Sequence, residues 1–180
     1  MKEDYIHCKK VINDKMSDFL YQYLLLKRQS FLTLHNNHLI SKFDEDKGRW
    51  GDGQVDNSFC IYGDTVFDLL LANVKHVMEK QTKVKLIETY SYARVYHKGN
   101  ELKKHRDRAS CKISATMNLG GDPWKIYLEL KNKKTKGFLL NPLSAALALL
   151  VAFNSTQEDI AKDFGAIGVT EFRKDISSSQ

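Results

Sequence analysis

Apolar and polar side chains alternate without interruption from Cys111 to Leu119, and this period of two residues constrains the fold more than any other feature. Alternation of this kind is typical of a strand with one buried face, because successive side chains point to opposite sides of a strand. Residues 120–123 have the composition of a turn, after which the alternation resumes over 124–130. The pattern predicts two strands joined as a hairpin, followed by a short third strand over 138–140.

Two amphipathic helices are predicted upstream of these strands. The first begins at Asn13 or Asp14 and runs to about Arg28, and the second begins after Asp64 and runs to about Lys80. The apolar residues of each recur at helical spacing and are expected to face the core. They are Met16, Phe19, Leu20, Tyr23 and Leu24 in the first helix, and Phe67, Leu70, Leu71, Val74, Val77 and Met78 in the second.

The order of these elements indicates the fold class. Residues 33–63 are polar and rich in glycine, which predicts a long loop or a loop with short strands. The stretch around Tyr90, Tyr92 and Val95 is rich in aromatic and β-branched residues and favours a strand. Helices followed by closely spaced strands predict an α+β fold, with a β-sandwich or barrel supported by N-terminal helices. A chain of 180 residues is long enough for one such domain.

The last part of the chain differs in character from the rest. Residues 143–152 are rich in leucine and alanine, which favours a helix. Ser155 and Glu158 form a capping-box pattern that predicts a further helix to about Phe164, and residues 177–180 are expected to fray. We therefore divide the chain into residues 1–142 and an atypical C-terminal segment, 143–180, that is helical and then frayed.

Charge and cysteine content restrict the partners and the location. The formal charge is +6, which permits an acidic partner such as nucleic acid, but no nucleic-acid motif is recognised. The three cysteines, Cys8, Cys60 and Cys111, lack metal-like spacing and indicate free thiols in a reducing cytosol. The first ten residues are polar and the longest apolar run, 143–153, is too short to span a bilayer. We expect a cytoplasmic protein without a membrane partner, in the host cytoplasm if a virus encodes it.

The tripeptide His105-Arg106-Asp107 is the candidate metal site. In a strand, residues two apart point to the same face, so an imidazole and a carboxylate there can bind one metal ion. Ferrous oxygenases use two histidines and one carboxylate on one side of the iron and leave the other positions open. The tripeptide alone is weak evidence, because a loop histidine paired with a surface aspartate is the simpler interpretation.

The surrounding sequence resembles that of the double-stranded β-helix oxygenases that use Fe(II) and 2-oxoglutarate. The shared pattern is a strand, Tyr-x-x-Gly and then His-x-Asp, and here Tyr96-His97-Lys98-Gly99 precedes His105 by six residues. The likeness is closest to small prolyl 4-hydroxylase-like proteins of phages and bacteria. It is strong over 90–130 and looser over 10–142. It implies a jelly roll, with a barrel that is incomplete if the C-terminal segment does not contribute, and the cofactors Fe(II), 2-oxoglutarate and ascorbate.

The resemblance also implies roles for individual residues. His105 and Asp107 would hold the iron, and Tyr96 would help to hold 2-oxoglutarate, although a half-buried strand tyrosine is an equal alternative. Arg94 could bind a carboxylate of the substrate or the cosubstrate, although an exposed strand arginine is the simpler interpretation. Tyr90 and Tyr92 are expected to pack against neighbouring side chains. Thr116 and Asn118 are expected to line the pocket.

The sequence departs from the family pattern after Pro142. The family has a second metal-binding histidine on a late strand and a basic residue beyond it, yet no histidine follows His105 here. We favour a replaced or frameshifted C-terminus, because the mismatch begins abruptly. The alternatives are a third ligand from Glu158, Asp159 or Asp163, or an upstream histidine, either His35 or His38.

Three functions are therefore open. The chain is a dioxygenase that hydroxylates a prolyl-type peptide or a small molecule, or an inactive remnant that acts as a binding module. The third hypothesis is a basic protein directed to nucleic acid, which the charge alone supports.

Overall fold

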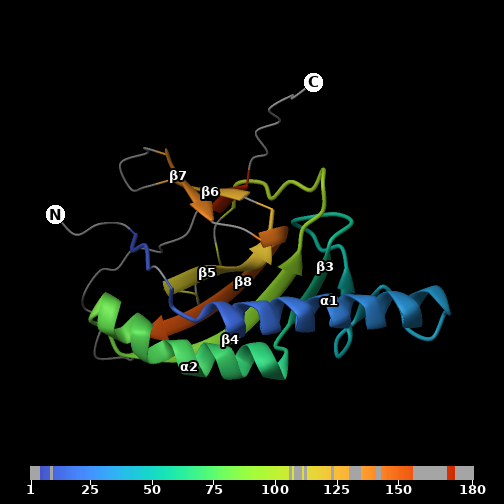
Figure 1. Cartoon of the computed structure of the whole chain (residues 1–180), viewed down its shortest axis with the longest axis horizontal. Coiled ribbons are helices and arrows are strands. Elements are labelled where there is room, and N and C mark those ends of the chain that lie inside the picture. The colour runs from blue at the N-terminus through green and yellow to red at the C-terminus, as the bar shows by residue number, and fades with distance from the viewer. Residues whose placement is uncertain are drawn as a thin grey trace.

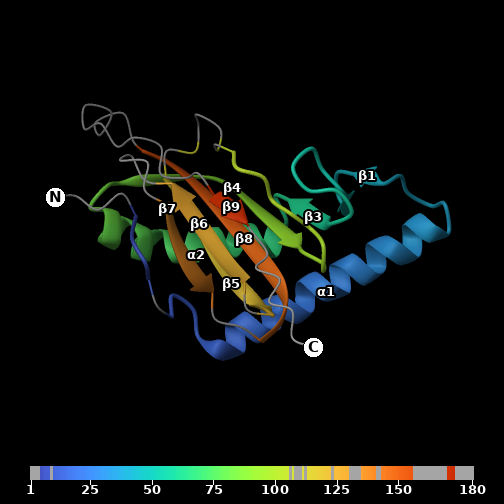
Figure 2. The ribbon, with the colours of Figure 1, turned by 90° about the horizontal axis from the view of Figure 1, so that it is seen from above.

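The structure is a computed structural model, and it describes residues 5–8, 10–105, 107, 111, 113–122, 124–129, 135–140, 143–155 and 170–172. Two helices lie along one face of a six-stranded sheet, and a three-stranded sheet lies on its other side (Figure 1). Viewed from above, the smaller sheet covers part of the larger one (Figure 2). The chain is thus a mixed helix and strand fold whose antiparallel sheets do not close into a barrel over the described residues.

The larger sheet contains six antiparallel strands in the order β1-β2-β3-β4-β8-β5. Their bounds are Phe43–Asp44 for β1, Gly48–Trp50 for β2, Phe59–Tyr62 for β3, Leu86–Val95 for β4, Ile113–Gly121 for β5 and Leu143–Ser155 for β8. The smaller sheet has the order β7-β6-β9, with β6 at Trp124–Glu129, β7 at Thr135–Leu140 and β9 at Thr170–Phe172. The loop with short strands predicted within 33–63 is confirmed by β1, β2 and β3.

Helix α1 (Asp14–Asn36) begins where predicted but continues beyond Arg28. The Asn13 side chain caps it by accepting a hydrogen bond from the backbone N–H of Met16 at 2.8 Å. Leu20, Leu24 and Phe31 are buried, whereas Met16 and Phe19 are 45% and 62% exposed, so the prediction that these two face the core is wrong. The reason is that the helix touches the sheet along a narrow stripe on one side.

Helix α2 (Thr65–Thr82) agrees closely with the prediction. The Asp64 carboxylate caps it by accepting from the N–H of Val66 at 3.0 Å. Four residues of its predicted apolar stripe are buried against the sheet: Phe67, Leu70, Leu71 and Val74. The core therefore lies between the two helices and the larger sheet, with Phe31, Phe59, Leu86, Ala93, Val95 and Ile113 among its members.

Strand β5 confirms the predicted alternation, because Ile113, Ala115, Met117 and Leu119 belong to the core side. The predicted hairpin with the next strand is wrong: β5 pairs with β8, and β6 pairs with β7 and β9. Gly120 and Gly121 continue β5 instead of forming the turn, so the chain leaves one sheet after them and enters the other. A side chain at Gly120 would meet the Tyr21 ring of α1, with a Cβ at 2.5 Å from its nearest carbon.

Strand β8 replaces the helix that the sequence predicts over 143–152, and that prediction is wrong. The strand pairs with β4 on one side and with β5 on the other, so its backbone groups form ladders along both edges. Tertiary pairing of this kind overrides the weak helical preference of leucine and alanine. Residues on both sides of the division at 142 share this sheet. The predicted helix over 155–164 and the frayed tail lie outside the described residues, apart from Ser155 itself, which ends β8.

No helix in the described part of the chain is both long enough and apolar enough to cross a membrane.

Candidate metal and carboxylate site

Strand β4 presents two faces with different roles. Ser91 donates to Asp68 of α2 at 2.6 Å, and Ala93 and Val95 belong to the core, so this face meets the helices. Alternation then places Tyr92 and Arg94 on the opposite face. The chain continues beyond β4 through Tyr96 and a turn at 97–100 toward His105.

His105 and Asp107 converge, although their backbone is not the predicted one. Both residues lie in irregular backbone between β4 and β5, so the prediction of a shared strand face is wrong. Their side chains nevertheless meet, with His105 Nε2 at 3.6 Å from Asp107 Oδ1. On the other side of the imidazole, Nδ1 lies 2.9 Å from the carbonyl oxygen of Lys103. A carbonyl at Nδ1 fixes the tautomer that leaves Nε2 as the ligand atom.

The two groups stabilise each other's charge. Hydrogen bonding to Asp107 raises the pKa of His105, although burial and the positive charge of Arg94 oppose the shift. Burial by itself raises the pKa of Asp107, but its contacts with His105 and the nearby Ser114 hydroxyl outweigh burial and lower it. The lowered pKa favours the ionised form of Asp107, and the raised pKa favours the protonated form of His105. A divalent cation can take the place of that proton between the same two atoms.

The separation of the two atoms suits chelation of one ion. Two ligand atoms at right angles, with metal bonds of about 2.1 Å, lie about 3 Å apart, close to the observed 3.6 Å. An imidazole and a carboxylate are also two of the three ligands of a ferrous oxygenase site. Within the described ranges, however, no group of three His, Cys, Asp or Glu side chains is placed to hold a metal.

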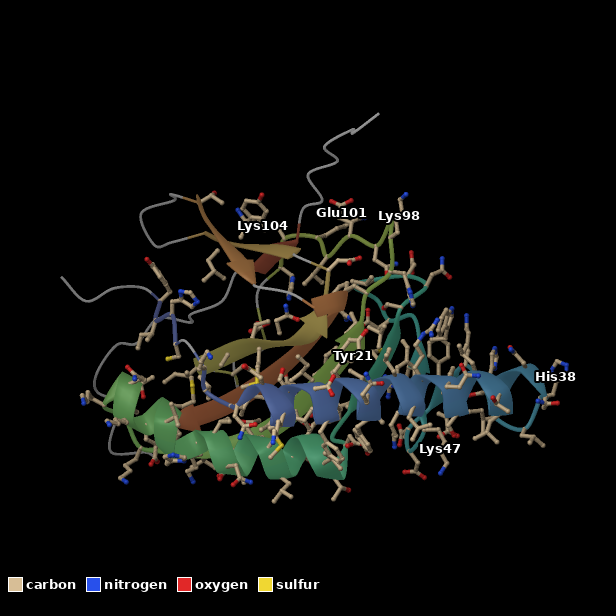
Figure 3. All side chains as sticks on the ribbon, viewed as in Figure 1. Tyr21, His38, Lys47, Lys98, Glu101 and Lys104 are labelled. Carbon is tan, nitrogen blue, oxygen red and sulfur yellow. The ribbon has the colours of Figure 1, made fainter. Side chains whose placement is uncertain are left out.

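The alternative ligands named from the sequence divide into two groups. Glu158, Asp159 and Asp163 lie outside the described residues. His38 lies at the far end of α1, well away from Lys104, which precedes His105 (Figure 3). His35 belongs to the same end of α1, where its ring stacks on Phe31. The interpretation that borrows His35 or His38 as a ligand is therefore wrong.

Arg94 is buried, with 3% of its surface exposed, so the simpler interpretation of an exposed strand arginine is wrong. Its Nη2 donates to the Asp52 carboxylate, to the Tyr92 hydroxyl at 2.9 Å and to Gln54 Oε1 at 3.2 Å. Its Nη1 donates to the Tyr96 hydroxyl at 3.1 Å. Its Nε is buried and has no hydrogen-bond partner among the residues that the structure describes.

Tyr96 is 4% exposed and joins this network through its hydroxyl. Burial raises the pKa of Tyr96, against the opposing charge of Arg94. Tyr92 was expected to pack, and its hydroxyl in fact donates to Asp52. Tyr90 packs on Tyr62 with ring centroids 4.8 Å apart.

Asp52 is the site residue that sequence reasoning missed. It lies 42 residues upstream of the arginine that it contacts, in a segment whose composition indicated a loop and nothing more. An aspartate between two glycines is a common turn pattern, so no local signal pointed to Arg94.

Strand β5 approaches the site through Ser114. Ser114 lies near Asp107, and alternation places Thr116 and Asn118 on the same face as Ser114. That Thr116 and Asn118 line a pocket stays a prediction.

Comparison with known proteins identifies the fold. No model of a protein family matches the sequence, and no curated protein matches it. Among solved structures, a prolyl-4-hydroxylase from Pseudomonas putida is similar, with a TM-score of 0.50 and 12% sequence identity. The similarity covers 82% of this chain and 80% of that chain. At such low identity the likeness concerns the fold alone, which is prolyl-4-hydroxylase-like.

Proposed function

We propose that this protein is an Fe(II)- and 2-oxoglutarate-dependent dioxygenase that hydroxylates a prolyl-type peptide or a small molecule. The observation that carries the proposal is the meeting of His105 Nε2 and Asp107 Oδ1 at 3.6 Å within a prolyl-4-hydroxylase-like fold. The proposal extends to the architecture: the two facing sheets correspond to the two sides of an open jelly roll.

His105 and Asp107 are the proposed iron ligands. Iron bound there supplies the activation of O₂ and the oxidative decarboxylation of 2-oxoglutarate that the reaction requires. The Lys103 carbonyl at His105 Nδ1 would leave Nε2 as the ligand atom, and the nearby Ser114 hydroxyl helps to lower the pKa of Asp107. A third ligand from Glu158, Asp159 or Asp163 stays an alternative to the favoured interpretation of a replaced or frameshifted C-terminus.

Arg94 and Tyr96 are the proposed cosubstrate residues. A buried guanidinium binds carboxylates strongly, and the basic residue that relatives place late in the chain is not recognised here. The Nε of Arg94 lacks a protein acceptor in the described part of the chain. Its cross-strand neighbours are Ala148 on β8, which has no side-chain acceptor, and Cys60 on β3, which has a weak one. A carboxylate of 2-oxoglutarate would satisfy this donor. Ascorbate stays an expectation from the resemblance.

The test is anaerobic titration with Fe(II), followed by measurement of succinate released from 2-oxoglutarate after O₂ is admitted. We expect His105→Ala and Asp107→Ala to abolish Fe(II) binding and succinate release. His76→Ala is the matched control, because His76 is exposed on α2. An unchanged protein that neither binds Fe(II) nor releases succinate would contradict the proposal.

A second candidate is a binding module without turnover. It is favoured by the lack of a third metal ligand among the described side chains. Binding of Fe(II) and 2-oxoglutarate without succinate release would support it.

The hypothesis of a nucleic-acid partner rests on the charge of +6 alone. Binding of DNA or RNA that weakens steeply with added salt would support it. The cytoplasm stays the expected location.

A further inference from the structure

We infer that Asp52 is a positioning residue that orients Arg94, and through it Tyr96, for a carboxylate-bearing ligand. The inference rests on the proposed function, because it concerns the same cosubstrate site. It assigns a role to a residue that makes no contact with the reacting atoms.

The Asp52 carboxylate divides its two oxygens between two tasks. Oδ1 accepts from the backbone N–H groups of Gln54 at 2.9 Å and Val55 at 2.8 Å, and so closes a tight turn. Oδ2 accepts from Arg94 Nη2 and from the Tyr92 hydroxyl. An amide has one acceptor oxygen, so asparagine can serve the turn or the guanidinium but not both.

The loop that carries Asp52 is fixed at several points. The N–H of Gly51 donates to the Ser58 carbonyl at 2.7 Å, and Ser58, fully buried, donates through its hydroxyl to the Val55 carbonyl at 3.1 Å. The Asn100 side chain donates to the Asp56 carbonyl at 2.9 Å. Because Asn100 belongs to the turn between β4 and His105, the loop and the metal-binding segment are held together.

The position that Asp52 gives to one nitrogen of the Arg94 guanidinium also fixes the other nitrogens. The guanidinium is planar and rigid, so fixing Nη2 and Nη1 also fixes the direction of the Nε–H bond. Asp52 and Gln54 hold Nη2, and the Tyr96 hydroxyl holds Nη1. Asp52 therefore sets the direction of the buried Arg94 Nε–H, which has no acceptor among the described residues, and the place of the Tyr96 hydroxyl. It also neutralises a buried cation, which is costly to leave unpaired.

A different role for Asp52 is that of an internal competitor, whose carboxylate occupies the position that a ligand would take. The geometry argues against it, because Oδ1 is held by the loop backbone while Oδ2 binds Arg94. The two roles predict opposite effects of removing the charge. Loss of a positioning group weakens ligand binding, whereas loss of a competitor strengthens it.

The experiment compares Asp52→Asn with Asp44→Asn in the full chain. Asp44 is the matched control, because its Oδ1 also accepts two backbone N–H groups, from Asp46 at 3.1 Å and Lys47 at 2.7 Å, in an exposed turn. The affinities for Fe(II) and for 2-oxoglutarate are measured separately under anaerobic conditions. We expect Asp52→Asn to weaken 2-oxoglutarate binding about 10- to 100-fold and to leave Fe(II) affinity unchanged, and Asp44→Asn to change neither.

A spectroscopic measurement separates positioning from general loss of structure. The ¹⁵N–¹H signal of Arg94 Nε, assigned by its loss in Arg94→Lys, should shift when 2-oxoglutarate is added to the unchanged protein or to Asp44→Asn. It should not shift in Asp52→Asn. If Asp52→Asn does not fold, Tyr92→Phe removes a donor to the same carboxylate oxygen, and we expect it to weaken 2-oxoglutarate binding about fivefold.

Several results would overturn the inference. The first is 2-oxoglutarate binding that is equal or tighter in Asp52→Asn or, where that variant does not fold, in Tyr92→Phe. The second is an Arg94 Nε signal that does not shift when 2-oxoglutarate is added to the unchanged protein. The third is no binding of 2-oxoglutarate to the unchanged protein. Failure of the proposed function is a separate result. A protein that binds 2-oxoglutarate but releases no succinate refutes dioxygenase activity, while the comparison of affinities still decides the role of Asp52.

Discussion

The Asp64 carboxylate joins the two helices, and its removal gives a sharp test of the fold. It caps α2 through the N–H of Val66 at 3.0 Å and accepts from the Tyr23 hydroxyl of α1 at 2.8 Å. It also pairs with Lys27 of α1 at 3.1 Å, and its side chain is 5% exposed. Burial, followed by hydrogen bonding to Asp64, raises the pKa of Tyr23 above its ordinary value. The tyrosine is therefore a neutral donor at neutral pH.

The expected cost of Asp64→Ala follows from these contacts. An N-cap interaction is worth about 1 kcal/mol. A tyrosine hydroxyl that loses its acceptor costs about 1.5 kcal/mol. The partly exposed pair with Lys27 adds about 0.5 kcal/mol. We expect the variant to lower the free energy of unfolding by about 3 kcal/mol.

The assay is urea denaturation at neutral pH, followed by circular dichroism. Asp64→Asn keeps an acceptor oxygen for the cap and should lose about 1 kcal/mol, as should Tyr23→Phe. Asp18→Ala, at an exposed position on α1, is the control and should change little. A loss of under about 1 kcal/mol in Asp64→Ala, or an equal loss in Asp64→Asn, would refute the reasoning.

Three further predictions concern the site and the sheet. The pKa of His105 is raised above its ordinary value of about 6.5, and its proton must leave before a metal binds. Fe(II) affinity should therefore increase with pH across and above that ordinary value, and a flat profile in anaerobic titration would contradict this. Gly48 has φ +115°, and a Cβ there would lie 2.6 Å from the Phe59 ring. Gly48→Ala should therefore lower the free energy of unfolding, measured in urea, by about 2 kcal/mol or more. An unchanged midpoint of urea unfolding would count against the close packing of Gly48 on Phe59. Ala148→Pro removes a backbone N–H from β8, which is paired on both edges, and should lower the free energy of unfolding by about 3 kcal/mol or more. An unchanged free energy of unfolding in the same urea experiment would argue that 143–155 is not a central strand.

Local signals predicted the helices well, because their causes lie within a few residues. Asn13 and Asp64 cap the two helices as expected, since a capping side chain reaches N–H groups only two or three residues ahead. The alternation from Cys111 to Leu119 likewise predicted which face of β5 is buried, because Ile113, Ala115, Met117 and Leu119 lie on the core side. The pairing of His105 with Asp107 was also local, although the backbone that achieves it is irregular.

Distant partners account for the errors. Residues 143–152 form a strand because β4 and β5 supply hydrogen bonds along both of its edges, and neither neighbour can be read from leucine and alanine content. Arg94 is buried because Asp52 and Gln54 approach it from a loop some forty residues upstream. The hairpin expected after β5 fails for the same reason, since β5 pairs with β8 instead of with its neighbour in sequence.

The insertion of β8 between β4 and β5 has a consequence for how the protein is made. These two strands emerge from the ribosome first, yet they pair with β8 and not with each other, so both wait for residues 143–155. Sheets closed by such distant pairing form slowly, and an unpaired strand edge recruits other chains in the meantime. A nascent or truncated chain that stops near residue 142 would expose both edges at once. We therefore expect yield during synthesis to depend on chaperones that shield β4 and β5 until β8 has been made.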